Sequence, residues 1–517
     1  MKKLLSILSL ASCAMLAMGQ EKILPLTPNR DTTLSHSFAV VAEAKHNNEA
    51  QKLRHEIDAL LAAQGLAISS VGVDSLPDMT IVLGGKSSSV AALIDSARGN
   101  YSQVMLAPLS GKANAKLIAQ RLKKEYYSGS RPAITTIFTD GQNGYKSFRI
   151  PSVTRTASGA IIAFAEARAD YRDQASNDLV CRVSHDNGAT WGDLTVVAAD
   201  GEASLNNPMA IYVEELDRVA IIYQRFPPAT SEGAVKAGMD GDVVRCFIKY
   251  SDDHGQSWSE ARDITRSVKP DNVASFCSGP GVGIRVTKGP NKGRIVVPMN
   301  VNGSPEWYNY LIYSDDLAQT WHRSSAHSAY GTNESSVVQI SDTSFLVNAR
   351  SHRNIADSSW AQPRGWSPWN FTRVTRHRAN IAVDLLDSTA RWHAPQIMDN
   401  QPDPTCQGSI TRLGHFGDGK PSMVLLSNSA SNYTFIEKRA YRATPPMRVN
   451  GTVKLSLDEG QTWAYAKRYY GNRATETQYS VLVDLTKGKI GCIFEANNNI
   501  KFAIFDLAWL SSGEIKK

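Results

Sequence analysis

Cysteine is scarce in this chain of 517 residues, and no two of its cysteines stand in a C-x-x-C arrangement. That spacing is typical of zinc sites and redox centres, so neither is predicted. We expect the residues after Cys13 to be buried, unpaired side chains on strands. These are Cys181, Cys246, Cys277, Cys406 and Cys492.

Long apolar runs and runs of basic residues are also missing. Beyond the first twenty residues, no window has the unbroken apolar length of a transmembrane helix. The net charge of +7 is spread along the chain, which argues against a nucleic-acid-binding tract. A mildly basic surface suits an anionic ligand.

The N-terminus has the pattern of an export signal, which we place at residues 1–19. Two lysines precede the apolar stretch Leu4–Leu16, and small residues follow up to Gly19. The run 10–13 (LASC) also resembles a lipoprotein cleavage box at Cys13, but the apolar residues after it favour cleavage near Gly19. Either outcome predicts an exported protein, which is periplasmic, associated with the outer membrane or secreted.

Residues 20–130 alternate between strand-like and helix-like patterns, which predicts a small α/β module. The expected elements, in order, are strand Phe38–Ala42, helix Asn48–Ala63, strand Thr80–Leu83, helix Ser88–Ala97, strand Val104–Leu106 and helix Ala113–Tyr126. The module has no phosphate loop, ligand cluster or aromatic stripe. We interpret it as an accessory or packing domain, with carbohydrate binding as the alternative.

The rest of the chain contains a repeated eight-residue template, Ser-x-Asp-x-Gly-x-(Ser/Thr)-Trp. It occurs at Ser184–Trp191, Ser251–Trp258, Ser314–Trp321 (with Ala318 in place of glycine) and Ser456–Trp463. A worn copy, Leu385–Trp392, keeps Asp387 and Trp392 and restores a nearly constant interval between tryptophans. A fixed period of this length indicates a repeat architecture.

Each residue of the template has a physical role in a tight turn between strands. The aspartate can accept hydrogen bonds from backbone N–H groups, the glycine permits an unusual φ, and the tryptophan can pack between neighbouring units. Short β-rich runs surround these turns, among them Ala160–Ala165, Arg218–Tyr223, Gly293–Pro298 and Met423–Ser427. The segments resemble the Asp boxes of β-propellers. We therefore predict an all-β six-bladed propeller over residues 140–517.

Several residues that the repeat does not explain carry a more specific resemblance. The tetrapeptide Phe148–Pro151 (FRIP) precedes the first box, and an F/Y-R-I-P sequence followed by Asp boxes is similar to the exo-sialidases of the neuraminidase superfamily. That family binds a substrate carboxylate with three arginines, because planar guanidinium groups grip a carboxylate with two hydrogen bonds. The resemblance assigns these roles to Arg149, Arg350 and Arg448. Arg439 and Arg442 are weaker candidates for the third position.

The stretch Arg168–Asp173 resembles the family's acid/base loop. The resemblance makes Asp173 the group that protonates the departing glycosidic oxygen and later activates water, with Asp170 as a lesser candidate. It also places Arg168 and Asn207 beside O4 of the sugar. In the loop before the third box, Trp307, Tyr308 and Tyr310 suggest either a platform for the leaving group or simple packing.

The resemblance assigns the nucleophile to Tyr479 and its base to Glu334. Most retaining glycosidases use two carboxylates, and sialidases with a tyrosine nucleophile are an exception. The physical reason is that a carboxylate nucleophile would be repelled by the carboxylate on the anomeric carbon. A neutral phenol avoids this repulsion if a nearby carboxylate takes its proton.

Together, these features predict an exported exo-α-sialidase that works with retention and needs no cofactor or metal. The resemblance implies that its partners are sialylated glycoproteins, glycolipids or oligosaccharides. Two alternatives stay open: a trans-sialidase, in which an acceptor sugar or an internal hydroxyl replaces water, and a sialoglycan-binding propeller without turnover. Linkage preference, oligomeric state and structural calcium do not follow from the sequence.

Overall fold

The computed structural model describes residues 36–63, 68–70, 79–83, 103–107, 115–120, 122, 132–302, 307–351, 355–357, 371–375, 377–385, 389–419, 422–430, 434–437, 448–471, 476–511 and 515. Contacts divide the chain into two compact units, Met1–Arg131 with Ser512–Ile515 and Pro132–Ser511 with Lys516–Lys517. The expected export signal and Cys13 lie outside the described residues. None of the helices in these ranges is long and apolar enough to cross a membrane.

The first unit is a parallel four-stranded sheet with helices. Its strands are β1 (His36–Ala42), β2 (Ile68–Ser70), β3 (Met79–Leu83) and β4 (Gln103–Ala107), in the order β2-β1-β3-β4. A single 3-10 turn, η1 (Ala44–His46), leads into helix α2 (Asn47–Ala62). The expected strands and first helix are confirmed, and the helix expected at Ser88–Ala97 lies outside the described residues.

The core of this unit follows from two periodicities. Phe38 and Val40 alternate along β1 and so lie on one face of the sheet, where they join Ile57 and Leu61 of α2 in one buried cluster. The same cluster includes side chains from the helical residues 115–120, namely Ala115, Ile118 and Ala119. This module therefore has a hydrophobic core of its own.

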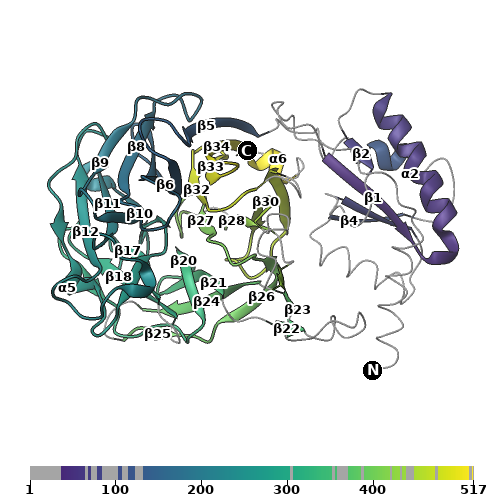
Figure 1. Ribbon diagram of the computed structural model, residues 1–517. Coiled ribbons are helices and arrows are strands. Elements are labelled where there is room, and N and C mark those ends of the chain that lie inside the picture. The colour runs from purple at the N-terminus through teal and green to yellow at the C-terminus, as the bar shows by residue number, and fades with distance from the viewer. Residues whose placement is uncertain are drawn as a thin grey trace. The chain divides into compact units, whose positions relative to one another are not determined.

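The second unit contains six sheets that form the blades of a propeller, each built on four antiparallel strands (Figure 1). Blade one contains β6 (Ser147–Arg155), β7 (Ile161–Arg168), β8 (Asp178–Ser184) and β9 (Thr195–Ala198). Blade two contains β10 (Ser204–Val213), β11 (Arg218–Phe226), β12 (Arg245–Ser251) and β13 (Arg262–Asp263), with β15 (Gly281–Val282) beside β10. Blade three contains β14 (Ser275–Ser278), β17 (Ile295–Asn302), β18 (Tyr308–Ser314) and β19 (His322–Arg323), with β16 (Ile284–Arg285) beside β17.

The remaining blades repeat this plan. Blade four contains β20 (Thr332–Gln339), β21 (Ser344–Ser351), β24 (His377–Asp384) and β25 (Arg391–Trp392), with β26 (Gln396–Pro402) beside β24. Blade five contains β27 (Ser409–Arg412), β28 (Val424–Ser429), β30 (Gly451–Ser456) and β31 (Tyr465–Tyr470). Blade six contains β32 (Ser480–Asp484), β33 (Lys489–Glu495), β34 (Asn499–Asp506) and β5 (Ala133–Thr139).

Smaller elements occur between the blade strands. A separate sheet joins β22 (Ile355–Asp357), β23 (Phe371–Thr375) and β29 (Thr434–Glu437). The short helices are η3 (Glu214–Leu216), η4 (Glu232–Ala234), α5 (Thr265–Val268) and α6 (Leu507–Leu510). The sheet links the loop after β21 to the loop after β28, which belong to neighbouring blades.

The ring is closed by its first strand. β5 pairs antiparallel with β34, so the outermost strand of blade six comes from the start of the unit (Figure 1). The units divide after Arg131, next to the expected end of the module at residue 130, and β5 lies before the expected start of the propeller at residue 140. The sequence-based boundary leaves out β5 because the partner of this strand lies more than 350 residues along the chain, as the contact of Lys501 with Thr136 illustrates.

The Asp boxes form the expected turns, between the third and fourth strands of blades one, two, three and five. In the first box, Asp186 Oδ1 accepts a hydrogen bond from the backbone N–H of Thr190 at 2.9 Å, and Ser184 Oγ accepts one from Gly188 N at 2.8 Å. Gly188 has a φ of +86°, and Ala318 of the third box adopts a φ of +67° despite its side chain. In the worn box, Trp392 lies on β25, while Asp387 lies outside the described residues.

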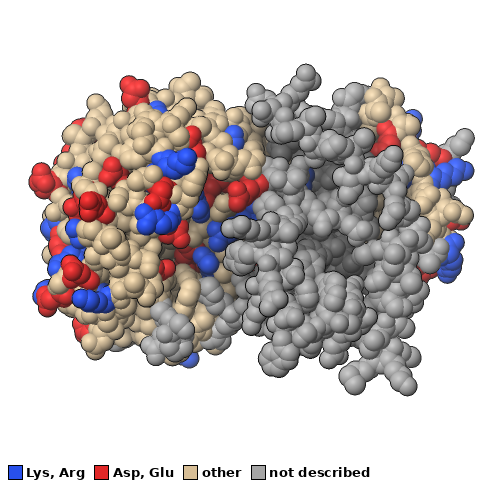
Figure 2. Space-filling view, viewed as in Figure 1, with Lys and Arg blue, Asp and Glu red and all other residues tan. Residues whose placement is uncertain are grey.

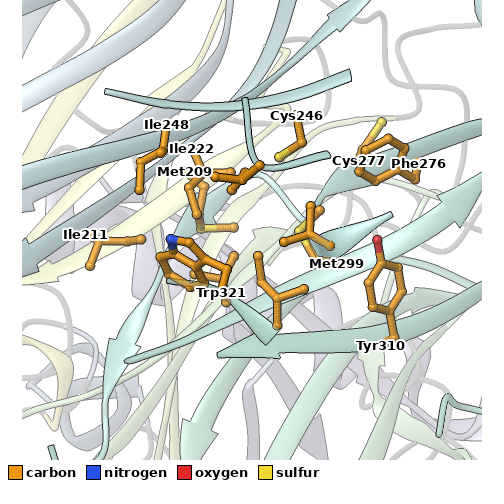
Figure 3. Close-up of a cluster of buried hydrophobic side chains, with 14 of the residues drawn as sticks. Met209, Ile211, Ile222, Cys246, Ile248, Phe276, Cys277, Met299, Tyr310 and Trp321 are labelled. Carbon is orange, nitrogen blue, oxygen red and sulfur yellow. The ribbon is translucent and has the colours of Figure 1, made fainter. Parts of the chain in front are cut away.

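The box tryptophans pack between blades, as predicted. Trp191 meets Phe502 of blade six edge-on with ring centroids 5.3 Å apart, and Trp258 meets Phe164 of blade one at 5.7 Å. Figure 3 shows Trp321 in the cluster between blades two and three, together with Tyr310. Tyr310 is 1% exposed, so it has the packing role and cannot form a platform for a leaving group.

The predicted strand runs of the propeller are confirmed in β7, β11, β17 and β28. All residues of β7 are buried, because a middle strand is covered on both faces by neighbouring blades. The five described cysteines are buried and unpaired, as expected. Cys406 differs from the expectation in lying between β26 and β27 rather than on a strand. Figure 2 shows basic and acidic side chains interspersed on the visible face of the propeller.

Candidate active site

The candidate residues converge where the innermost strands of the blades begin. Arg149 lies on β6, Asn207 on β10 and Glu334 on β20, while Tyr479 directly precedes β32. These inner strands surround the centre of the ring (Figure 1). Residues that are far apart in sequence therefore meet at one end of the central axis.

The central contact joins a phenol to a carboxylate. The hydroxyl of Tyr479 donates a hydrogen bond to Glu334 Oε1, and Arg350 Nη1 lies 2.8 Å from Glu334 Oε2. Tyr479 is 7% exposed and Glu334 9%. Burial raises the pKa of Tyr479 well above its usual value, and Glu334 adds to the rise, while Arg350 and Arg448 oppose it. The phenol is therefore neutral at physiological pH and is hydrogen-bonded to a group that can take its proton.

Two further arginines flank the ring of Tyr479. The guanidinium carbons of Arg149 and Arg448 lie 5.7 and 5.6 Å from its centroid. Gln478 Oε1 accepts hydrogen bonds from both arginines, from Arg149 Nη2 at 3.2 Å and from Arg448 Nη1 at 3.0 Å. With Arg350, three guanidinium groups surround one phenol, an arrangement that attracts an anion.

Arg149 is held in place by a carboxylate and by its own backbone. Its Nε forms an ion pair with Glu495 Oε1 at 2.9 Å, and the same oxygen accepts a hydrogen bond from Ile150 N at 2.7 Å. Ile150 has a φ of +54°, a conformation that a β-branched residue rarely adopts. Its side chain is buried against Tyr479 and Cys406. Backbone strain at a binding residue is common at functional sites.

Arg168 and Asp173 form a second cluster. Arg168 is 1% exposed, and its Nε and Nη2 donate to Glu166 Oε2 at 2.9 and 2.6 Å. Arg168 Nη1 reaches Asp173 Oδ1 at 2.8 Å, and 74% of the Asp173 side chain is exposed. Partial burial opposes ionisation of Asp173, but Arg168, Arg149 and Arg448 outweigh it and lower its pKa. Asp173 is therefore ionised in the unliganded site.

The neighbouring candidates occupy different positions. Asp170 forms an ion pair with Arg172 at 2.6 Å at the surface and takes no part in the Arg168 cluster. Asn207 joins that cluster through its backbone, since its N–H donates to Glu166 Oε1 at 2.7 Å. Arg439 and Arg442 lie outside the described residues, so the structure offers no comparison of them with Arg448.

Sequence reasoning missed three residues that hold this site together: Glu166, Gln478 and Glu495. Glu166 and Glu495 each follow a run of apolar residues in their strands, and a buried carboxylate requires a cationic or hydrogen-bonding partner. That requirement was a usable signal for both. Gln478 offers no comparable signal, because its neighbours in sequence are polar and only folding brings Arg149 to it. Within the described residues there is no cluster of three or more histidine, cysteine or acidic side chains suited to a metal ion.

Comparison with known proteins gives a family and several relatives. The pattern of the family described as BNR repeat-like domain matches residues 159–492, more than half of the chain. A sialidase from Micromonospora viridifaciens is 28% identical over 398 residues, which cover 74% of this chain but only 55% of the relative. The chain thus matches about half of that relative's length.

Solved structures share the fold at lower identity. The Hadza microbial sialidase Hz136 has a TM-score of 0.60 and 20% identity over 73% of this chain and 69% of its own. The intramolecular trans-sialidase from Ruminococcus gnavus, in complex with oseltamivir carboxylate, has a TM-score of 0.56 and 17% identity over 76% of this chain and 99% of its own. At these identities the two structures support the propeller fold alone.

Proposed function

The chain belongs to the family of BNR repeat-like domains, and from this membership and the propeller centre we propose that it is a retaining exo-α-sialidase. The observation that carries the proposal is the hydrogen bond from Tyr479 to Glu334 among three arginines. A pure binding site for an anion would need the arginines, but it has no need of a phenol paired with a base. The named relative, a sialidase, supports the same activity.

In this proposal the arginines bind the substrate through its carboxylate. Arg149, Arg350 and Arg448 would each donate hydrogen bonds to the carboxylate of a terminal sialic acid. The hydrogen bonds of Arg149 and Arg448 to Gln478 Oε1 show that two of these arginines can share one oxygen acceptor. Arg168 and Asn207 would contact the sugar on the side of O4.

The first chemical step forms a bond between the Tyr479 oxygen and the anomeric carbon. The phenolic proton passes to Glu334 as the glycosidic C–O bond breaks, and Asp173 gives a proton to the departing oxygen. In the second step, water gives a proton to Asp173 and attacks the anomeric carbon. The bond to Tyr479 breaks, and its oxygen recovers the proton from Glu334. Two displacements at one carbon retain its configuration.

Asp173 must be protonated before the first step, although nearby arginines lower its pKa in the free site. A bound substrate carboxylate would neutralise part of the charge of Arg149 and Arg448, which weakens that effect. The sugar would also exclude water from a side chain that is now mostly exposed. Both changes raise the pKa of Asp173 when substrate is present.

We also propose that the substrates are sialylated glycoproteins, glycolipids or oligosaccharides outside the cytoplasm. The export signal expected at residues 1–19 supports this location. No residue of the proposed mechanism requires a cofactor.

The test is release of a fluorogenic aglycone from an α-sialoside by the wild type and by Tyr479→Phe. We expect turnover by the wild type and a loss of at least a thousandfold in the variant, because the nucleophile is removed. Tyr310→Phe is the matched control, since it removes a hydroxyl from another buried tyrosine and leaves Glu334 untouched. Equal inertness of wild type and variant, with binding of sialosides retained, would refute the enzyme in favour of a lectin.

Product analysis by NMR separates the related reactions. Free sialic acid that first appears as the α anomer supports retaining hydrolysis. A sialylated acceptor or an anhydro sugar would instead indicate transfer to an acceptor or to an internal hydroxyl. These products would refute hydrolysis while leaving the role of Tyr479 intact.

A further inference from the structure

A buried ion pair lies beneath the candidate active site and has no part in the proposed chemistry. Arg378 of β24 is fully buried, Asp403 is 1% exposed, and Arg378 Nη1 lies 3.1 Å from Asp403 Oδ2. Arg378 also donates through Nε to Asn348 Oδ1 and through Nη1 to the carbonyl oxygen of Cys406, the latter at 2.9 Å. Asn348 stands two residues before Arg350 on β21.

The pair holds one segment, Asp403–Gly408, which connects blade four to blade five. Asp403 Oδ1 accepts a hydrogen bond from Cys406 N at 2.7 Å. Gly408 lies against the guanidinium of Arg378 so closely that a Cβ there would come within 2.9 Å of its Cζ. Thr405 has a φ of +60°, so the segment contains a strained residue that its surroundings must hold. We call Asp403–Gly408 the floor segment.

The floor segment contacts both Arg448, which is proposed to bind the substrate carboxylate, and Tyr479, the proposed nucleophile. The carbonyl oxygen of Thr405 accepts a hydrogen bond from Arg448 Nη2 at 3.0 Å. Cys406 is buried against Tyr479 and Ile150. Gln407 Oε1 accepts a hydrogen bond from the backbone N–H of Ser480 at 2.9 Å, the residue that follows Tyr479.

Stability alone does not account for this pair. Burial disfavours the charged forms: it lowers the pKa of Arg378 and raises that of Asp403. Removing two charges from water often costs as much as their attraction returns, so such pairs are weak evidence for a stabilising role. Their fixed, directional hydrogen bonds are better suited to specifying one conformation of the backbone.

We propose that Arg378 and Asp403 are positioning residues that fix the floor segment and thereby set Arg448 and Tyr479 in their working geometry. The inference rests on the proposed function, because it assigns the two residues to the same site. Neither side chain would touch the substrate. Their loss should change binding and turnover through displaced partners.

The variant that tests this is the double substitution Arg378→Met with Asp403→Asn. A single substitution would leave an unpaired buried charge and endanger the fold, whereas the double variant is neutral and similar in volume. The matched control is Arg294→Met with Asp315→Asn. It removes another ion pair with a nearly buried arginine, at 2.7 Å, in which the half-exposed Asp315 belongs to the third Asp box.

We expect the double variant to stay folded and to lose at least tenfold in kcat/KM for an α-sialoside. The inhibition constant of free sialic acid should rise, because Arg448 is displaced, and kcat should fall, because Tyr479 is displaced. The control should stay folded and leave kcat and KM within twofold of the wild type. Wild-type kinetic constants in the folded double variant, or an equal kinetic loss in the control, would overturn the inference.

Failure of the proposed function would be seen separately, as a wild type without turnover. In that case a crystal structure of the double variant decides the inference by itself. A shift of Thr405 away from Arg448 supports the positioning role, and an unchanged floor segment refutes it.

Discussion

Substituting Glu334 by glutamine would separate the two roles that the structure gives this carboxylate. Glutamine has nearly the same shape but carries no charge and cannot take a proton from a phenol. In the wild type, one carboxylate oxygen accepts the hydrogen bond of Tyr479 and the other pairs with Arg350 at 2.8 Å. The variant therefore loses a general base and, in the same step, an anion beside a substrate-binding arginine.

Loss of the base should lower kcat, whereas loss of the anion should strengthen binding of the substrate carboxylate. Loss of a general base lowers the rate by roughly 10²–10⁴-fold, or about 2.7–5.5 kcal/mol of transition-state stabilisation. Loss of the anion frees Arg350 for the substrate carboxylate. Two unit charges about 4 Å apart interact by ~4 kcal/mol at an effective dielectric constant of 20. A quarter of this energy, about 1 kcal/mol, would tighten binding about fivefold.

We therefore expect Glu334→Gln to lower kcat steeply without raising the inhibition constant of free sialic acid. Steady-state kinetics with a fluorogenic α-sialoside, together with inhibition by sialic acid, measure both quantities. Glu495→Gln is the matched control, since Glu495 pairs with Arg149 at 2.9 Å and does not contact the Tyr479 hydroxyl. That variant should keep kcat close to the wild-type value, because the base is intact, and the loss of the charge beside Arg149 should act only on binding, in the same direction as in Glu334→Gln.

The opposite pattern would refute this reasoning. If Glu334→Gln kept at least a tenth of kcat while its affinity for sialic acid fell tenfold, Glu334 would be a binding residue. The base would then have to be sought elsewhere. Similar effects of the two glutamine variants on kcat would also contradict the separate roles given to Glu334 and Glu495.

Two further predictions concern stability. Gly188→Ala should lower the free energy of unfolding by about 2–4 kcal/mol, because φ is +86° and the new Cβ would lie 2.4 Å from the ring of Phe502. Urea titration of both variants is the measurement. Gly141→Ala is the control, because φ is +82° there but no atom lies within 4 Å of the new Cβ, and it should lose only about 1 kcal/mol of the free energy of unfolding. Equal losses in the two variants would contradict the clash with Phe502. Burial, with a smaller contribution from Arg378, lowers the pKa of Lys454 to about 7. Between pH 7 and about pH 10 the unfolded chain therefore binds one more proton at this side chain than the folded protein does. Stability should therefore rise with pH across this window by up to about 1.4 kcal/mol per unit. Lys454→Met should reduce that slope in unfolding curves at pH 7 and 9, and an unchanged slope would show that Lys454 is charged in the folded protein.

The propeller could be predicted because its main signal is local. The hydrogen bonds that form an Asp-box turn, such as those among Ser184, Asp186, Gly188 and Thr190, join residues within eight positions. The same sequence therefore forms the same turn in every blade that contains it, and the interval between tryptophans measures the length of a blade. β5 has no such signal. Its place in blade six depends on pairing with β34, which only ring closure brings within reach.

The candidate active site likewise has features that the sequence determined and features that only tertiary structure determined. The sequence by itself determined the turns, the number of blades and, through the resemblance, which arginines, carboxylates and tyrosine to examine. Tertiary structure alone decided that Tyr479 meets Glu334 across 145 residues and that Glu495 meets Ile150 across 345. It also placed Arg378 and Asp403 beneath Arg448. The physical reason is that a turn depends on neighbours in the chain, whereas the partner of a buried charge is whichever group the packing of the blades brings to it.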